Sequence, residues 1–132
     1  MAANPTFAVT PKIGQVRLAV ANTNRDGTGT LGTVYTGASA GSRVLWVQAM
    51  ATAATTAGAI RLYVDNGSSV SLWREVLVTA LTPSVTVLGW QSSWFSPTPG
   101  EPLLLLPSTS YVLKASTHIA ESFDIIACVL DL

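Results

Sequence analysis

The chain has few charged residues, and this shortage excludes several classes of partner. Only 11% of its 132 residues are charged, whereas an average soluble domain carries roughly 25%. Seven cations balance seven acids, so the formal net charge is zero. The cations are scattered singly, without the basic patch that is typical of nucleic-acid binding. We therefore expect no nucleic acid and no membrane among the partners of the chain.

Cysteine and long apolar segments are scarce as well. The single cysteine, Cys128, excludes an intrachain disulfide, and its apolar surroundings in the sequence predict a buried, inert thiol. No apolar run approaches the ~18 residues of a membrane span. The start of the chain, Met-Ala-Ala-Asn-Pro-Thr, lacks the basic region and the apolar core of a signal peptide. We therefore expect the chain to be made and folded in a cytoplasm.

The sequence offers no set of residues for catalysis or for metal binding. His118 is the only histidine, and we expect it at a strand end near a turn, because no strand-to-helix elbow for a nucleophile is present. Residues Asn22 to Gly27 echo the spacing of a calcium loop but supply one carboxylate only. A polar turn, held by Asn and Asp side chains, explains them better. The sequence thus predicts neither an enzyme nor a bound cofactor or metal.

Short apolar stretches, rich in β-branched residues and Trp, alternate with Gly, Pro, Asn and Asp along the whole chain. This pattern predicts an all-β fold, a single-domain antiparallel β-sandwich that is jelly-roll-like, with eight or nine strands. The expected strands are residues 15–21, 31–36, 42–51, 59–65, 70–80, 84–95, 102–106, 110–116 and 123–131. We expect residues 1–14 to form an amino-terminal arm, since two prolines interrupt them, and residues 15–132 to form the sandwich.

Three local features refine this expectation. Asn66-Gly67 is a strong hairpin signal. The stretch 42–51 is apolar on both faces, with Val44 and Trp46 on the same one, and this predicts a central strand. Arg74 falls on the apolar face of its strand, which indicates an edge strand, an interface or a β-bulge.

Tryptophan is abundant, with four residues in the chain. Trp46 is expected in the core. The segment from Trp90 to Phe95, which includes Trp94, has three possible roles: part of the core, a subunit interface, or a surface that stacks on a glycan.

Several segments resemble small virion proteins of tailed bacteriophages, in order and spacing, over most of residues 4–127. These segments are Ala21–Gly29, Thr55–Gly58 followed by Ile60–Leu62, Leu72–Glu75 and Leu113–His118. The resemblance implies a head decoration or cement protein, typically a homotrimer, that clamps neighbouring capsomers on the outside of the capsid. Its partners would be further copies of the chain and the major capsid protein. It would be located on the capsid surface of the virion and be synthesised in the cytoplasm of the bacterial host.

The candidate contact residues follow from these interpretations. Phe7, Ala8, Val9 and Lys12 belong to the expected arm, and such an arm can add a strand to the sheet edge of a partner. A subunit interface or a ligand contact is expected at Arg74, Trp90, Trp94 and Phe95. The alternative function is a tail, fibre or head-fibre module that binds a glycan on the host surface.

Overall fold

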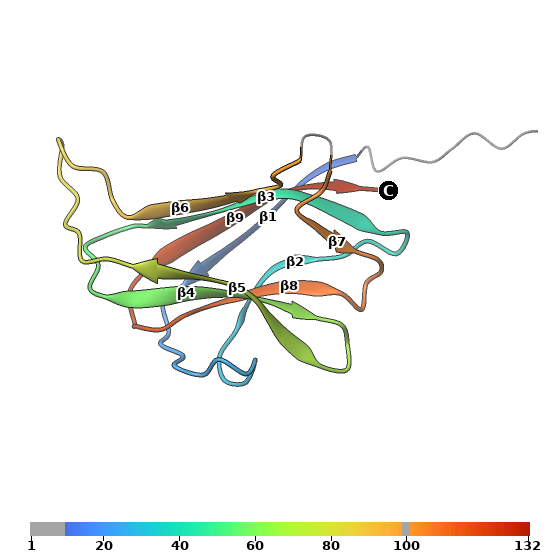
Figure 1. The fold of residues 1–132 in the computed structure, drawn as a ribbon, viewed down its shortest axis with the longest axis horizontal. Coiled ribbons are helices and arrows are strands. Elements are labelled where there is room, and N and C mark those ends of the chain that lie inside the picture. The colour runs from blue at the N-terminus through green and yellow to red at the C-terminus, as the bar shows by residue number, and fades with distance from the viewer. Residues whose placement is uncertain (1–9, 99–100) are drawn as a thin grey trace, which may run out of the picture.

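The computed structural model describes residues 10–98 and 101–132, which fold into two packed β-sheets (Figure 1). The described residues contain nine strands, and all pairings between these strands are antiparallel. They are β1 (Thr10–Leu18), β2 (Gly32–Thr36), β3 (Ser42–Ala51), β4 (Gly58–Asp65), β5 (Val70–Val78), β6 (Gln91–Phe95), β7 (Leu104–Leu106), β8 (Val112–Thr117) and β9 (Phe123–Asp131). Within this part of the chain no helix is present that would be long and apolar enough to cross a membrane.

The strand order is that of a jelly roll. Sheet A has the order β1-β9-β3-β6, with the short β7 also paired to β3, and sheet B has the order β2-β8-β4-β5. The first strand thus pairs with the last, β2 with β8, β3 with β6 and β7, and β4 with β5. This nested pairing is what results when a long antiparallel ribbon rolls up into two sheets. The predicted all-β sandwich, its jelly-roll character and its number of strands are therefore confirmed.

The core lies between the two sheets and is made of the inward-facing residues of both. Full burial of one Val, Leu, Ile or Phe side chain stabilises a fold by about 1.5–3 kcal/mol, and many such residues are present. The largest apolar side chains with essentially no exposed surface are Tyr63, Phe123, Ile60, Leu62, Leu106, Leu113, Ile125, Val44, Val47 and Val129. All of them except Tyr63 belong to this core.

The amino-terminal boundary of the sandwich differs from the predicted one. Strand β1 begins at Thr10, so residues 10–14 belong to the sheet and not to an arm. Pro11 is tolerated there because β1 is an edge strand, paired on one side only, with β9. The remaining arm candidates, Phe7, Ala8 and Val9, lie outside the described residues.

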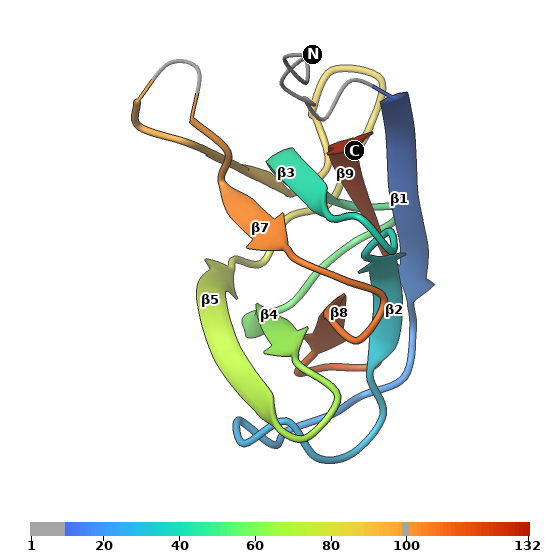
Figure 2. The same cartoon turned by 90° about the vertical axis from the view of Figure 1, so that its right-hand side faces the viewer.

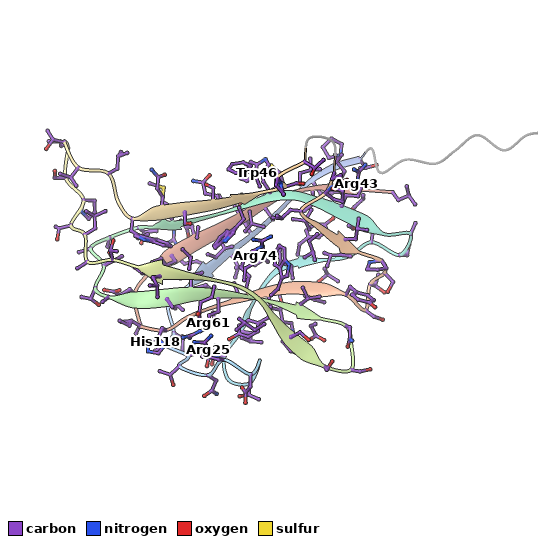
Figure 3. All side chains as sticks on the ribbon, viewed as in Figure 1. Arg25, Arg43, Trp46, Arg61, Arg74 and His118 are labelled. Atoms are coloured by element: carbon purple, nitrogen blue, oxygen red, sulfur yellow. The ribbon has the colours of Figure 1, made fainter. Side chains whose placement is uncertain are left out.

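Register shifts interrupt the pairing of β2, β3 and β5, and the two in β3 and β5 concern residues whose facing was predicted. One bulge in β3, between Val44 and Trp46, keeps Val44 inside and turns Trp46 to the outer face (Figure 3). The prediction that both share a face was wrong, because an extra residue reverses the alternation. The other bulge lies in β5, an edge strand, and Trp73 is the extra residue there. Two of the three alternatives expected for Arg74, an edge strand and a β-bulge, are therefore present, with the bulge at its neighbour Trp73.

One side of the sandwich is closed where β1 and β2 run next to each other (Figure 2). Gly14 of β1 makes this approach possible, since a Cβ atom at this position would lie 2.5 Å from the Val34 carbonyl oxygen. Nearby, the Tyr35 hydroxyl of β2 donates to both carboxylate oxygens of Asp131 in β9, at 2.7 and 2.8 Å. Hydrogen bonds and close backbone contact therefore join the two sheets along this side.

The predicted hairpin is also present. Strands β4 and β5 are joined at Asn66-Gly67, where Gly67 has a φ of +91°. The Asn66 side-chain oxygen accepts the backbone N–H groups of Ser68 and Ser69. The turn therefore uses the two residue types that tolerate and stabilise a tight reversal.

Candidate interaction surface

The outer face of sheet A, which points away from sheet B, carries a row of apolar side chains across four strands. The pairing register places Ile13 of β1 opposite Cys128 of β9, Cys128 opposite Trp46 of β3, and Trp46 opposite Phe95 of β6. The rings of Trp46 and Phe95 lie 6.1 Å apart. Ile13 and Phe95 are 64% and 63% exposed, and Trp46 and Cys128 between them are half-buried, so the row is most open to a partner at its two ends.

Two shallow depressions lie on this outer face. The first, with a volume of about 400 Å³, is almost entirely apolar and is lined by Pro11, Lys12, Ile13, Leu45, Cys128, Val129 and Leu130. We call it the apolar depression. The second, of about 380 Å³, is more polar and contains Arg17 and Asp124. The two depressions therefore suit partners of different chemistry, and only the first suits an apolar side chain.

A loop at the other end of the molecule exposes further apolar side chains. Residues 79–90 connect β5 to β6 and project from the end opposite to the start of β1 (Figure 1). Val85 is fully exposed, and Val87 and Leu88 are 41% and 70% exposed. These three residues are called the apolar tip below. No charged residue occurs between Glu75 and Glu101, so the tip is embedded in an uncharged segment.

The loop is held in place by hydrogen bonds at its tip and at its base. Ser84 and Val87 exchange backbone hydrogen bonds, at 2.9 and 3.4 Å. At the base, Thr55 and Leu81 pair through their backbones, and the Thr55 hydroxyl donates to the Thr79 carbonyl at 2.7 Å. The apolar tip is therefore presented by a preformed turn.

At least half of the charged residues form ion pairs within the chain. On the outer face of sheet A, Arg17 donates to Asp124 at 2.7 Å, and this hydrogen bond lowers the pKa of Asp124. On sheet B, Lys114 donates to Asp65 at 2.9 Å and lowers the pKa of that carboxyl group in the same way. These pairs neutralise charge inside one molecule, so they offer little net charge to a partner.

A polar cluster on the outer face of sheet B holds the loop of residues 22–30 against that sheet. Arg61 is 4% exposed; its Nε donates to Glu75 at 2.7 Å, and its two Nη atoms lie 3.3 Å from Nδ1 of His118. Arg25 of the loop lies 3.3 Å from the same Glu75, and Figure 3 shows Arg25, Arg61 and His118 together on this side. Arg61 contacts both Glu75 and His118, and Glu75 also contacts Arg25, so the cluster holds the loop against the sheet.

One hydroxyl group near this cluster is unsatisfied. Ser116, opposite Arg61 in the register, has a buried Oγ without a hydrogen-bond partner among the described residues. It lines a cavity of about 90 Å³ under the loop, a volume sufficient for a water molecule.

The loop itself is a polar turn, as predicted. The Asn22 side-chain oxygen accepts the Asn24 N–H at 3.0 Å, and the Asp26 carboxylate accepts the Thr28 N–H at 3.0 Å. The side chains thus bond to their own backbone. In the described part of the chain no three side chains from His, Cys, Asp and Glu gather into a metal-binding group.

The structure separates the residues that the sequence suggested as contacts. Lys12 is exposed on β1 and lines the apolar depression. Arg74 is exposed on β5, with its guanidinium carbon 5.1 Å from the centre of the Trp73 ring. Trp94 is half-buried against the core, and Phe95 points outward. The register therefore places only Phe95 on the apolar outer face, whereas Lys12 borders the apolar depression but pairs with Val129, a core residue.

One of the open roles is decided, and one assignment needs correction. Trp90 is 7% exposed and packs edge-on against Phe123, with ring centres 5.6 Å apart, so of the three roles expected for its segment Trp90 has the one in the core. Cys128 is half-buried on the outer face of sheet A and not enclosed in the core. Its strand is apolar on both sides because one side forms the core and the other forms the apolar row.

Two parts of the surface were missed from the sequence. Trp46 was assigned to the core, and nothing in the alternating pattern reveals the bulge that turns it outward. The apolar tip was taken as part of a strand over residues 84–95, whereas β6 begins at Gln91. The flanking Pro83 and Gly89 are the signals that indicate a loop there.

Comparison with known protein families found no family that matches the chain, and comparison with curated proteins found no match either. The class that the fold defines is a β-sandwich with jelly-roll topology.

Proposed function

We propose that the chain is a non-enzymatic structural protein of a tailed-bacteriophage virion. In this proposal it is a decoration or cement protein that binds the outside of the head as a homo-oligomer and stabilises the contacts between capsomers. The resemblance of its sequence segments to small phage virion proteins supports this function. The jelly roll is compatible with it, since viral capsid proteins use this architecture, but lectin domains use it too.

The observation that carries the proposal is the apolar outer face of sheet A. A small monomer exposes few large contiguous apolar patches, and larger ones mark interaction sites. Here an apolar row crosses four strands, and a second set of apolar side chains projects on the β5–β6 loop. A molecule with so little charge shields these apolar side chains from water best when it is part of an assembly.

The mechanism we propose is the sum of several weak contacts. An oligomer touches more than one capsomer. When one contact is released, the other contacts keep the oligomer in place, so the effective concentration at the released site stays high. No chemical step is needed for this function.

The second candidate is a tail, fibre or head-fibre module that binds a host glycan. The adjacent rings of Trp46 and Phe95 favour it, because exposed aromatic rings stack on sugars. The row beside them pairs Gln48 with Ser93, which supplies polar groups for sugar hydroxyls. Such a module would be present in few copies on each particle.

Copy number and particle binding distinguish these candidates. We expect mass spectrometry of purified particles to find hundreds of copies of the chain, and added protein to bind empty heads. Phe95→Asp places a charge on the outer face and should abolish this binding. Leu77→Asp is the matched control, since Leu77 is 74% exposed but faces outward on sheet B. A few copies per particle, or equal binding of both variants, would contradict the decoration role.

The same assay tests the proposed arm. Because β1 begins at Thr10, a deletion of residues 1–8 removes Phe7 and Ala8 and leaves the strand intact. Undiminished binding to heads after this deletion would remove the arm from the proposal, whereas the outer face would keep its role.

A further inference from the structure

We propose that the apolar tip of one copy docks in the apolar depression of a neighbouring copy. The inference rests on the homo-oligomer of the proposed function and names the two surfaces that form it. Val85, Val87 and Leu88 would supply the inserted side chains, and Ile13, Leu45, Cys128 and Leu130 would surround them.

The two surfaces cannot meet within one molecule. The tip projects beyond the end of the sandwich where β6 begins, and the depression lies near the start of β1 at the opposite end (Figure 1). An apolar group and an apolar recess at opposite ends of one chain can meet only between two copies.

The size of the tip matches that of the depression. The three side chains of the tip contain ten carbon atoms, and at ~30 Å³ for each heavy atom, as for a water molecule in the liquid, they fill about 300 Å³. The depression has a volume of about 400 Å³. The open depression therefore has room for two or three aliphatic side chains.

The charges of the two surfaces match as well. The tip lies in a segment without charged residues, and the depression is lined by a single charged residue, the exposed Lys12. A basic partner would find no opposite charge at either place, and an acidic partner would find only Lys12. A second copy of this neutral chain finds an apolar surface that needs no counter-charge.

The depression lies on a face with room for further contact between two copies. Four strands at ~4.8 Å and nine residues at ~3.3 Å give the outer face of sheet A a footprint of about 600 Å². A standard interface buries about 800 Å² of accessible surface on each partner, and the accessible surface of a rugged face exceeds its footprint. The preformed turn between Ser84 and Val87 also lowers the entropy that docking loses.

Mixing two variants tests the contact. Val85→Asp disables the tip, and Ile13→Asp disables the depression; both residues are exposed, so folding should be unchanged, which thermal unfolding verifies. We expect each variant alone to raise the Kd for self-association at least about tenfold, measured by analytical ultracentrifugation without particles. An equimolar mixture should associate again, because the intact tip of one variant meets the intact depression of the other.

Leu77→Asp serves as the control and should associate like the unchanged chain. The inference is overturned if the unchanged chain is a monomer, if either variant alone associates normally, or if the mixture stays monomeric. Particle binding is measured separately. If the mixture associates but the unchanged chain does not bind to heads, the decoration role is refuted and the proposed contact between copies stands.

Discussion

Tyr35 shows how a single residue joins the two sheets. Its hydroxyl on β2 donates to Asp131 on β9, and the Ser42 hydroxyl on β3 donates to the same carboxylate at 2.7 Å. Burial, followed by the hydrogen bond to Asp131, raises the pKa of Tyr35 to about 12. The sequence predicts the strands that carry these residues, but it does not predict that residues 96 positions apart meet across two sheets.

Tyr35→Phe should destabilise the fold by about 2 kcal/mol at neutral pH, because a hydrogen bond to a charged group is lost. Urea unfolding, followed by tryptophan fluorescence, measures this difference. The pKa in the folded state lies above the unfolded value of ~10, so the contribution is fully present below about pH 10. It should disappear as the pH rises through about 12.

The control for this prediction is Tyr111→Phe. Tyr111 is half-buried against the core, and no hydrogen bond of its hydroxyl to the described residues is present, so its loss should change stability little. If the difference in unfolding free energy between the unchanged chain and Tyr35→Phe stays constant up to about pH 12, the role assigned to the Tyr35 hydroxyl is contradicted.

At the scale of the elements, the sequence predicts most of the fold. All nine strands were anticipated, because alternating apolar residues and Gly or Pro turns mark them directly. The boundaries that failed have local physical causes. Pro11 was taken as a strand breaker although an edge strand tolerates it, and the apolar residues of the loop before Gln91 were taken as strand.

The interaction surface was less predictable than the strands. A bulge shifts the facing of every later residue in its strand, and the bulge at Leu45 has no Gly or Pro to announce it. Phe95 was recognised as a candidate, but its neighbour Trp46 was not. The order of the strands in sheet A determines which residues form the apolar row. This order follows from the jelly-roll topology and not from any one segment.

Gly14→Ala should destabilise the sandwich by about 2 kcal/mol, because the added Cβ would push β1 away from β2. The glycine is buried, and the nearest atoms are the Val34 carbonyl oxygen at 2.5 Å and the Tyr35 Cβ at 2.9 Å. Urea unfolding measures the effect. Gln15→Ala is the control, since Gln15 is exposed on the same strand and should tolerate the change. Equal stabilities of the two variants would show that β1 and β2 can separate freely.

The whole molecule has a net charge of zero, and at least half of its charged residues form internal ion pairs. Association between copies is therefore expected to depend on apolar contact. Asp65 and Asp124 have lowered pKa values because Lys114 and Arg17 donate to them. Their contribution to stability is present above the unfolded pKa of ~3.9 and is lost as the pH falls through the lower folded values.

These properties predict how the oligomer responds to salt and acid. Raising NaCl from about 0.1 to about 1 M shortens the Debye length from ~10 to ~3 Å, yet the Kd for association at pH 7 should not rise, since apolar contacts are not screened. As the pH falls below about 4 the carboxyl groups begin to be protonated, and each copy keeps the positive charges of its seven Lys and Arg residues. Copies should then repel one another, and the oligomer should dissociate as the fold loses its ion pairs. Analytical ultracentrifugation across salt and pH measures both responses. A Kd that rises steeply with NaCl at pH 7 would mean that charged pairs, and not the apolar tip and depression, hold the copies together.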